Sequence, residues 1–185
     1  MAFVLAACGT GAMPSRSVAT SASVPGVASA RTVGWSIYHD PAYGFAVELP
    51  VDATVVGMSQ SGAASVMIWR IPDPRDAADH ATLEIVETTR ANVGLCAGYT
   101  HGKPVALGAG QTGYEQDNLD AASATGAAGP PQVAASVVGQ GLFTTISFTG
   151  QAPAATFLAR WRDVWGHILA SFAPGKGPVG TQPCG

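Results

Sequence analysis

The sequence predicts an α+β domain in which an antiparallel β-sheet packs against one long C-terminal helix and shorter helical segments. Several segments between residues 35 and 149 alternate apolar and polar side chains, which is the period of half-buried strands. The segment 153–172 instead places its apolar residues at helical spacing. Because the strands follow one another and the helix comes last, antiparallel pairing is favoured over a parallel α/β sheet.

The first two strands are expected at 35–39 and 45–49, where apolar and polar side chains alternate. Asp40-Pro41 separates the two runs with a dipeptide that is typical of turns. Pro50 ends the second run, because proline cannot donate a ladder hydrogen bond.

The next two strands are expected at 65–71 and 82–88, which alternate in the same way. The acidic segment 73–79 lies between them. Its order of residues predicts one helical turn, with Asp73 as the N-cap and Pro74 at the first helical position.

The region between residues 91 and 149 mixes loops and strands. The glycine-rich stretch 91–113 has no clear period, and 121–131 has the Ala, Gly and Pro content of a loop. Gln140-Gly141 is a dipeptide that favours a tight β-hairpin. The strands expected in this region are 114–119, 132–139 and 142–149.

The clearest element is a helix over 153–172, whose apolar residues form one stripe with a period of about 3.6. Pro153 lies near its first turn, and Pro174-Gly175 end it. Residues 175–185 are expected to form an irregular tail. The stripe consists of Phe157, Leu158, Trp161, Val164, Trp165, Ile168, Leu169 and Phe172.

The composition suits one folded domain, which we expect to span residues 33–174 of the 185. Hydrophobic residues make up 47%, which is enough for a sizeable core. The formal net charge is −3, so nothing suggests a nucleic-acid partner, which would call for a basic patch. The chain also has no polybasic segment that would hold an anionic membrane surface.

The segment Leu5-Ala6-Ala7-Cys8 resembles the lipobox of bacterial lipoproteins. In that family a signal peptidase cuts before the cysteine, whose thiol carries a diacylglycerol. The resemblance implies that residues 1–7 are a truncated signal peptide and that Cys8 is the lipid attachment site. No Lys or Arg precedes Cys8, which departs from a full signal peptide. The alternative is a frayed terminus with a chance cysteine.

Residues 8–32 are expected to form a flexible tether. Between Gly9 and Ala30 the chain is rich in small residues and proline, with a single charge and no aromatic residue. Such a segment cannot bury enough apolar surface to offset the entropy lost on ordering. Together with lipid on Cys8, it predicts an extracytoplasmic, membrane-anchored lipoprotein of the cell envelope.

The three cysteines contain no C-x-x-C pair, which excludes zinc ribbons and thioredoxin-like chemistry. Lipid on Cys8 leaves Cys96 and Cys184. We expect these two to form a disulfide, because an exported chain meets an oxidising compartment. The alternative is that Cys96 is a small buried hydrophobe and Cys184 a free thiol in the tail.

A longer pattern resembles the PsbP/Mog1-like domain. The pattern is Tyr38-x-Asp40-x-x-Tyr43-Gly44-Phe45-x-Val47-x-Leu49-Pro50, followed by the later strands and a closing helix that ends in Ser171-Phe172. The resemblance covers roughly residues 35–174. It implies a sheet sandwiched by helices and a binding or assembly role, as in most members of that family. It carries over no binding residue.

No motif of nucleotide binding or nucleophilic catalysis is complete. The segment 108–113, "GAGQTG", fits the G-x-G-x-x-G pattern, but no amphipathic helix follows it, so a turn-rich loop is expected. No G-x-S-x-G segment is present. The sequence therefore predicts no catalytic residue and no cofactor-binding residue.

Histidines and acidic residues are the candidate metal ligands and catalytic groups of this sequence. The four histidines are His39, His80, His101 and His167, which lack metal-ligand spacing. His39-Asp40 is interpreted as a turn and His167 as a boundary residue of the helix. The acidic clusters are Asp73/Asp76/Asp79 and Glu115/Asp117/Asp120, and neither matches an EF-hand calcium loop. We therefore expect no metal site.

These observations favour a lipid-anchored protein whose non-catalytic domain binds an unidentified protein partner or helps to assemble one. The alternative is a carrier with a cavity for a small apolar ligand between the sheet and the helix 153–172. A closed apolar pocket of about 300 Å³ or more would favour the carrier, and a filled core the binding module. An envelope hydrolase ranks third, because no nucleophile–base set is present.

Overall fold

The computed structural model describes residues 33–89, 96, 98–118, 130–151 and 154–184. The strands are β1 (Trp35–His39), β2 (Ala46–Pro50), β3 (Thr54–Ser61), β4 (Ala64–Asp73), β5 (Asp76–Thr88), β6 (Lys103–Ala106), β7 (Thr112–Asn118), β8 (Gln132–Gly139) and β9 (Leu142–Gly150). The helical elements are the short 3₁₀ helices η1 (Tyr99–His101) and η2 (Gly108–Gly110) and the helix α2 (Ala154–Ser171).

The strands form a seven-stranded sheet and a separate two-stranded hairpin. The order in the large sheet is β3-β4-β5-β9-β8-β7-β6, and β1 pairs with β2. Every strand pair within the described residues is antiparallel. The α+β class with an antiparallel sheet and a C-terminal helix is therefore confirmed.

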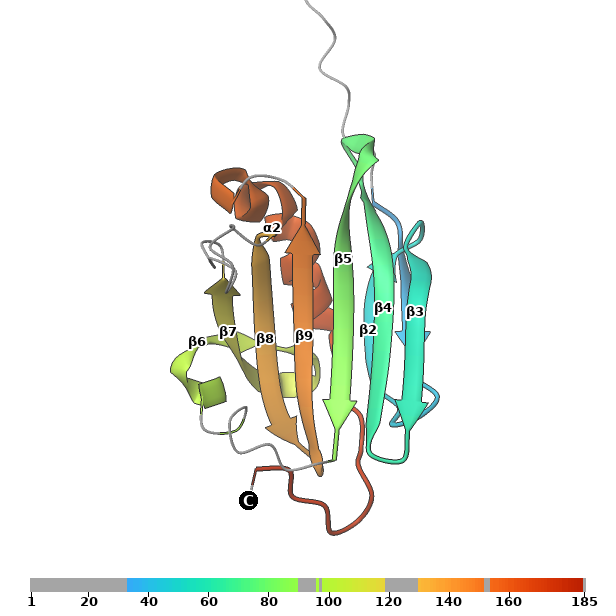
Figure 1. Ribbon diagram of the computed structural model, residues 1–185, viewed down its shortest axis with the longest axis vertical. Helices are drawn as coiled ribbons and strands as arrows, with labels where there is room; N and C mark the ends of the chain where they lie inside the picture. Colours follow the sequence, from blue (N-terminus) through green and yellow to red (C-terminus); the bar gives the residue numbers. More distant parts are fainter. Residues whose placement is uncertain (1–32, 90–95, 97, 119–129, 152–153, 185) are drawn as a thin grey trace, which may run out of the picture.

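The core lies between the large sheet and a second layer made of α2 and the β1–β2 hairpin (Figure 1). In β4, β5, β8 and β9, buried residues alternate with half-buried ones, because successive side chains of a strand point to opposite faces. The largest fully buried side chains are Trp69, Trp161, Phe45, Phe148, Phe157, Phe172, Met67, Ile71, Leu83, Ile85, Leu142 and Ile146.

Helix α2 buries the stripe that its sequence predicts. All eight apolar residues of the stripe are buried except Leu158, which is partly buried against the core. Phe148 of β9 lies at the centre of this contact, with its ring centroid 5.5 Å from that of Trp161 and 5.8 Å from that of Trp165. Aromatic pairs at these separations add to the stabilisation from buried area.

The β8–β9 hairpin turns at Gln140-Gly141, as expected. Both residues have positive φ, 50° and 80°, which is the backbone of the two-residue turns that match strand twist. Gly141 also has a packing requirement, since a Cβ there would lie 2.4 Å from Oγ1 of Thr181 in the tail.

The helical turn expected at 73–79 is wrong. Asp73 ends β4 and Asp76 begins β5, so this segment is the tip of a β-hairpin. Oδ1 of Asp73 accepts the backbone N–H of Arg75 at 2.7 Å. An aspartate closes turns and caps helices with the same type of bond, so the local pattern did not separate the two structures.

The strands β3 and β6 were not predicted. Seven of the eight residues of β3 are exposed, because it is an edge strand whose side chains reach beyond the core. The other edge, β6, has only four residues and contains Pro104. Neither strand has a buried face that would impose an alternating pattern.

The tail after α2 crosses the end of the sheet and is held by backbone hydrogen bonds. Lys176 N donates to Tyr43 O and Gly177 N to Gln140 O, each at 2.8 Å. At the end of the tail, Cys184 forms a disulfide with Cys96, and their Cα atoms are 5.4 Å apart. No helix in the described part of the chain combines the length and the hydropathy needed to cross a membrane.

Candidate binding groove

A groove of about 470 Å³ separates α2 from the β6–β7 edge of the large sheet. This volume lies within the range of about 300–1,000 Å³ that is typical of small-molecule sites. The lining residues are Lys103, Val105, Ala106, Glu115, Asp117, Leu158, Arg162, Trp165, Gly166 and Leu169.

Helix α2 supplies one wall of the groove as a continuous strip. The strip overlaps the edge of the core-facing stripe, with which it shares Leu158, Trp165 and Leu169. Its members lie on one side of the helix, since they recur at spacings of three and four residues or are adjacent in sequence. From Leu158 to Leu169 the helix rises eleven steps of about 1.5 Å, so the wall is about 17 Å long. The strip consists of Leu158, Arg162, Trp165, Gly166 and Leu169.

The floor of the groove is apolar and fixed in place. Trp165 and Leu169 are each 5% exposed, and Leu158 and Val105 are partly buried against the core. The indole Nε1 of Trp165 donates to Oε2 of Glu115 at 2.6 Å. This bond satisfies the only polar atom of the indole and sets the orientation of its ring.

The rim of the groove is charged. Lys103, Arg162 and Asp117 are exposed. Their charged groups make no hydrogen bond or ion pair with another residue in the described part of the chain. Lys103 is opposite Glu115 in the β6–β7 register, yet no ion pair within 4.0 Å joins them.

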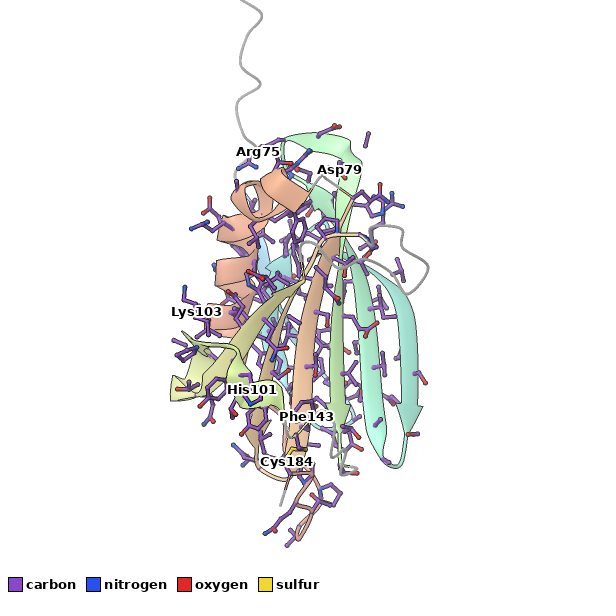
Figure 2. The ribbon with its side chains drawn as sticks, turned by 60° about the vertical axis from the view of Figure 1, so that its left-hand side comes forward. Arg75, Asp79, His101, Lys103, Phe143 and Cys184 are labelled. Atoms are coloured by element: carbon purple, nitrogen blue, oxygen red, sulfur yellow. A yellow bond between two sulfur atoms is a disulfide. The ribbon has the colours of Figure 1, made fainter. Side chains whose placement is uncertain are left out.

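A polar hollow adjoins the groove where β7 extends past the end of β6. It also measures about 470 Å³, and Lys103, Glu115 and Asp117 line both spaces. Figure 2 shows Lys103 and His101 on this side of the molecule, with Lys103 beside α2. The hollow is lined by His101, Gly102, Lys103, Glu115, Gln116 and Asp117. The groove with its apolar floor therefore continues into the polar hollow.

Gly166 is the least expected residue of the groove. A glycine inside a helix costs about 1 kcal/mol relative to alanine. A Cβ added at Gly166 would meet no atom within 4 Å, so packing does not require the glycine. By contrast, a Cβ at Gly108 would lie 2.6 Å from Phe172 O. At Gly166 no side chain covers the helix backbone, which is therefore accessible from the groove.

A carrier was expected to have a closed apolar pocket, and this groove is not closed. It is open to solvent along its length, and the core beneath it is filled by packed side chains. It does lie between the sheet and the C-terminal helix, where the cavity was expected. The geometry therefore fits a surface-accessible binding site with an apolar floor.

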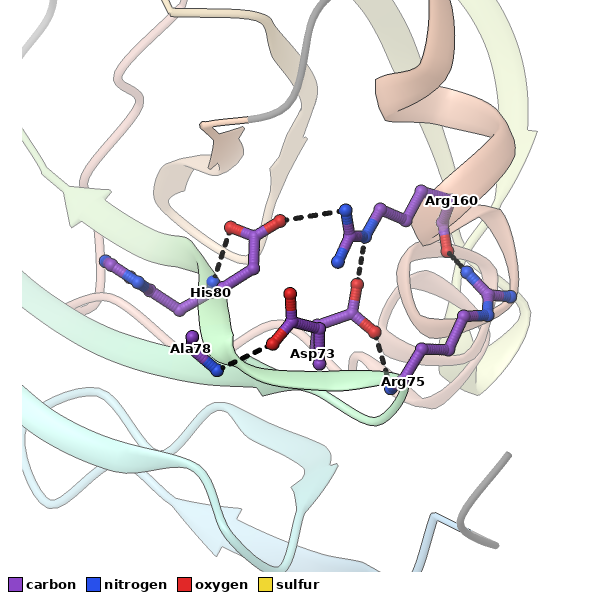
Figure 3. A network of polar contacts seen from close by, with 7 residues as sticks. Asp73, Arg75, Ala78, His80 and Arg160 are labelled. Carbon is purple, nitrogen blue, oxygen red and sulfur yellow. Dashed lines mark hydrogen bonds and ion pairs between the residues drawn. The ribbon is translucent and has the colours of Figure 1, made fainter. Parts of the chain in front are cut away.

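The acidic cluster at 73–79 is engaged by an arginine of α2 (Figure 3). Asp73 is buried, and one of its carboxylate oxygens accepts a hydrogen bond from Nε of Arg160. Asp79 pairs with the same guanidinium at 3.1 Å, and Arg75 donates to Arg160 O at 2.8 Å. The hydrogen bond to Asp73 raises the pKa of Arg160. These contacts fasten the hairpin tip to α2.

The other candidate metal ligands are scattered. In the second acidic cluster Glu115 and Asp117 line the groove, whereas Asp120 lies outside the described residues. Nowhere in the described ranges do three or more His, Cys, Asp or Glu side chains form a group that could hold a metal ion.

His167 fastens the β1–β2 hairpin to α2. Its Nε2 lies 2.6 Å from Oε2 of Glu48, and its ring stacks on Trp35 with centroids 3.6 Å apart. The backbone N–H of Glu48 donates to Oγ of Ser171, 3.0 Å away, one helical turn later. His167 thus lies at the boundary between helix and hairpin.

Three other sequence predictions, for Asp40, for the segment 108–113 and for the cysteines, can be compared with the structure. Asp40 closes a turn by accepting the N–H groups of Ala42 and Tyr43 at 3.0 and 2.6 Å. The glycine-rich segment 108–113 forms η2 and the start of β7, so a strand and not a helix directly follows the glycines. The expected Cys96–Cys184 disulfide is present, and Cys8 lies outside the described residues.

Most of the groove was missed by the sequence reasoning. Its residues lie at predicted core positions of the helix, in an acidic cluster or in the glycine-rich stretch that has no clear period. The one local signal was Gly166, a helix-weakening residue set between Trp165 and His167. No protein-family model, curated protein or solved structure matches the chain.

Proposed function

We propose that this protein is a lipid-anchored, non-catalytic binding protein of the bacterial cell envelope whose domain holds a small amphipathic ligand in the groove between α2 and β6–β7. The tether places the domain within reach of the membrane, and the groove takes the ligand. The groove is the observation that carries the proposal.

The location is supported by three features of the chain. Leu5-Ala6-Ala7-Cys8 resembles a lipobox, and residues 8–32 have the composition of a tether. The Cys96–Cys184 disulfide is the kind of bond that persists in oxidising compartments. A chain with these three features fits the outer side of a bacterial membrane.

The ligand-binding role is supported by the shape and chemistry of the groove. Its volume suits a small molecule, and its floor presents Val105 and Leu158 as partly exposed apolar side chains over the buried Leu169. Gly166 weakens α2 without a packing reason, and it leaves the helix backbone accessible at the middle of the groove. A ligand that contacts the helix backbone would explain why glycine occupies this position.

The first test uses N-phenyl-1-naphthylamine, an uncharged apolar fluorophore that reports the floor of the groove. Wild-type protein should bind it saturably at one site. Gly166→Leu should bind it at least tenfold more weakly, because the leucine side chain occupies the groove. The variant should remain folded, since a Cβ at this position would meet no atom within 4 Å and leucine favours the helix more than glycine does.

The matched control is Ala170→Leu, which adds a leucine to an exposed position of α2 that does not line the groove. It should bind the fluorophore as the wild type does. Equal binding by wild type, Gly166→Leu and Ala170→Leu would contradict a ligand site in this groove.

A second candidate function, docking of a protein partner, is favoured by the edge strand β3. It carries no charged residue, and Val55, Val56 and Met58 are 54–65% exposed. An exposed, uncharged edge strand is a template for pairing with a strand of another chain. Photocrosslinking from Met58 in the native host should then yield one defined adduct. Loss of that adduct in Val56→Pro would support strand pairing, and its persistence would contradict it.

A further inference from the structure

We infer that the occupant of the groove is a single-chain amphiphile with a zwitterionic head, its chain lying along α2 over Gly166 and its head in the polar hollow beside Lys103 and Asp117. This inference rests on the proposed function, because it names the class of ligand that the same site takes.

The head is placed by the arrangement of charges. The hollow and the groove share Lys103, Glu115 and Asp117, so a molecule that leaves the apolar floor on this side enters a space with both signs of charge. Glu115 already accepts the indole N–H of Trp165. Within the hollow, Lys103 and Asp117 therefore remain as a cation and an anion without partners among the described residues. Arg162 also has no such partner, but it lines the groove and not the hollow.

A zwitterion is the head that satisfies this pair. A purely anionic head would gain contact with Lys103 and would be repelled by Asp117 and Glu115. A purely cationic head would be attracted by the two acidic residues, but it would be repelled by Lys103 and by Arg162 on the facing helix. A head that carries one charge of each sign places both next to an opposite charge.

The chain is placed by the helix wall. The strip from Leu158 to Leu169 extends for about 17 Å, which suits an extended chain rather than a compact ring system. Gly166 removes the side chain that would otherwise project into this strip, so a slender molecule can contact the helix backbone. Trp165 and Leu169 supply apolar contacts on either side of it in sequence.

An extended peptide fits the site less well than an alkyl chain does. A peptide would gain affinity by pairing with the free edge of the sheet. Here that edge is β6, which has four residues, and Pro104 provides no backbone N–H. The strand therefore offers little of the hydrogen bonding that peptide addition requires.

The test compares three amphiphiles with the same tail, each used below its micelle concentration: dodecylphosphocholine, dodecyl phosphate and dodecyltrimethylammonium. Each competes with N-phenyl-1-naphthylamine for the full chain. Dodecylphosphocholine should bind at least about fivefold more tightly than either amphiphile whose head carries charge of one sign only, the ratio expected from one exposed charge pair.

Two variants that each remove one charge should change the affinities for different head groups in opposite directions. A purely structural role of these residues would not produce that pattern. Lys103→Gln should weaken dodecylphosphocholine about fivefold and strengthen dodecyltrimethylammonium. Asp117→Asn should weaken dodecylphosphocholine to a similar extent and strengthen dodecyl phosphate. Both residues are exposed, so neither substitution should change folding.

The outcomes separate this inference from the function on which it rests. Equal affinity for the three heads, with fluorophore binding still lost in Gly166→Leu, would overturn the zwitterionic head and leave the groove as a ligand site. Tighter binding of the purely anionic or the purely cationic amphiphile would also overturn the zwitterionic head. Failure of the fluorophore to bind the wild type would overturn both proposals.

Discussion

Replacing Glu87 with glutamine should stabilise the domain at alkaline pH and leave its stability nearly unchanged at acidic pH. Glu87 lies on β5 and is 0% exposed. Its Oε1 accepts hydrogen bonds from Gly175 N at 3.0 Å and Thr144 Oγ1 at 3.4 Å. Its Oε2 has no partner among the described residues.

The environment of Glu87 favours its protonated form. Burial raises the pKa of the carboxyl from 4.5 to about 7, and the negative charge of Asp40 adds to the rise. The hydrogen bonds from Gly175 and Thr144 act in the opposite direction but do not outweigh burial. The folded protein therefore holds a proton that the unfolded chain loses at lower pH.

The sign of the pH effect follows from this difference. The contribution of Glu87 to stability is fully present below about pH 4.5 and is lost as pH rises through about 7. The difference between the two pKa values corresponds to at most about 3 kcal/mol in the free energy of unfolding. Glutamine cannot ionise, and its amide oxygen can accept the N–H of Gly175 in place of Oε1.

The assay is urea unfolding at pH 4, 6 and 8 with the disulfide intact. Glu87→Gln should match the wild type near pH 4 and exceed it by up to about 3 kcal/mol at pH 8. The control is Glu84→Gln, which removes a half-buried carboxylate from the opposite face of the same strand. A difference between Glu87→Gln and wild type that stays constant from pH 4 to 8 would refute the reasoning.

Three further predictions concern packing, the disulfide and the anchor. Trp165→Ala should lower the free energy of unfolding by about 3–5 kcal/mol, because the indole is 5% exposed and stacks on Phe148; a change in melting temperature as small as that of a surface substitution would contradict this packing. Cys184→Ser should cost up to roughly 4–5 kcal/mol, because the disulfide joins residues 88 apart; an unchanged urea midpoint would show that the bond does not stabilise the domain. Cys8→Ser should abolish labelling by a fatty-acid analogue in the native host, and equal labelling of both proteins would exclude lipid on Cys8.

The parts of the fold that the sequence predicted are those with one buried face. The β8–β9 hairpin and α2 were located within one or two residues, because burial of one face imposes a period of two or of 3.6 on their side chains. The edge strands β3 and β6 have no such face and were missed. Only the pairing with a neighbouring strand defines them, and that pairing is not local in sequence.

The tip at 73–79 was misread for a different reason. The side chain of Asp73 bonds to a backbone N–H two residues later, and helix N-caps use the same kind of bond. What decides the structure is the pairing of β4 with β5 and the bond from Arg160 of α2. Both contacts join segments that are distant from the motif itself.

The candidate site could not be assembled from the sequence, because its walls come from three separate segments. Lys103 lies in the irregular glycine-rich stretch, Asp117 in an acidic cluster and Gly166 in the helix. Pairing of β6 with β7 and packing of α2 bring them to one groove. The disulfide was predictable, because one of the three cysteines lies in a segment that resembles a lipobox, which leaves one pair.

The most direct test of the central claim is a set of intermolecular nuclear Overhauser effects between dodecylphosphocholine and isotope-labelled protein. The claim predicts contacts from the methylene protons of the chain to the α-protons of Gly166 and the methyl groups of Leu169. It also predicts contacts from the head group to the side chain of Lys103. Contacts confined to another surface, or the same contacts in Gly166→Leu as in the wild type, would contradict it.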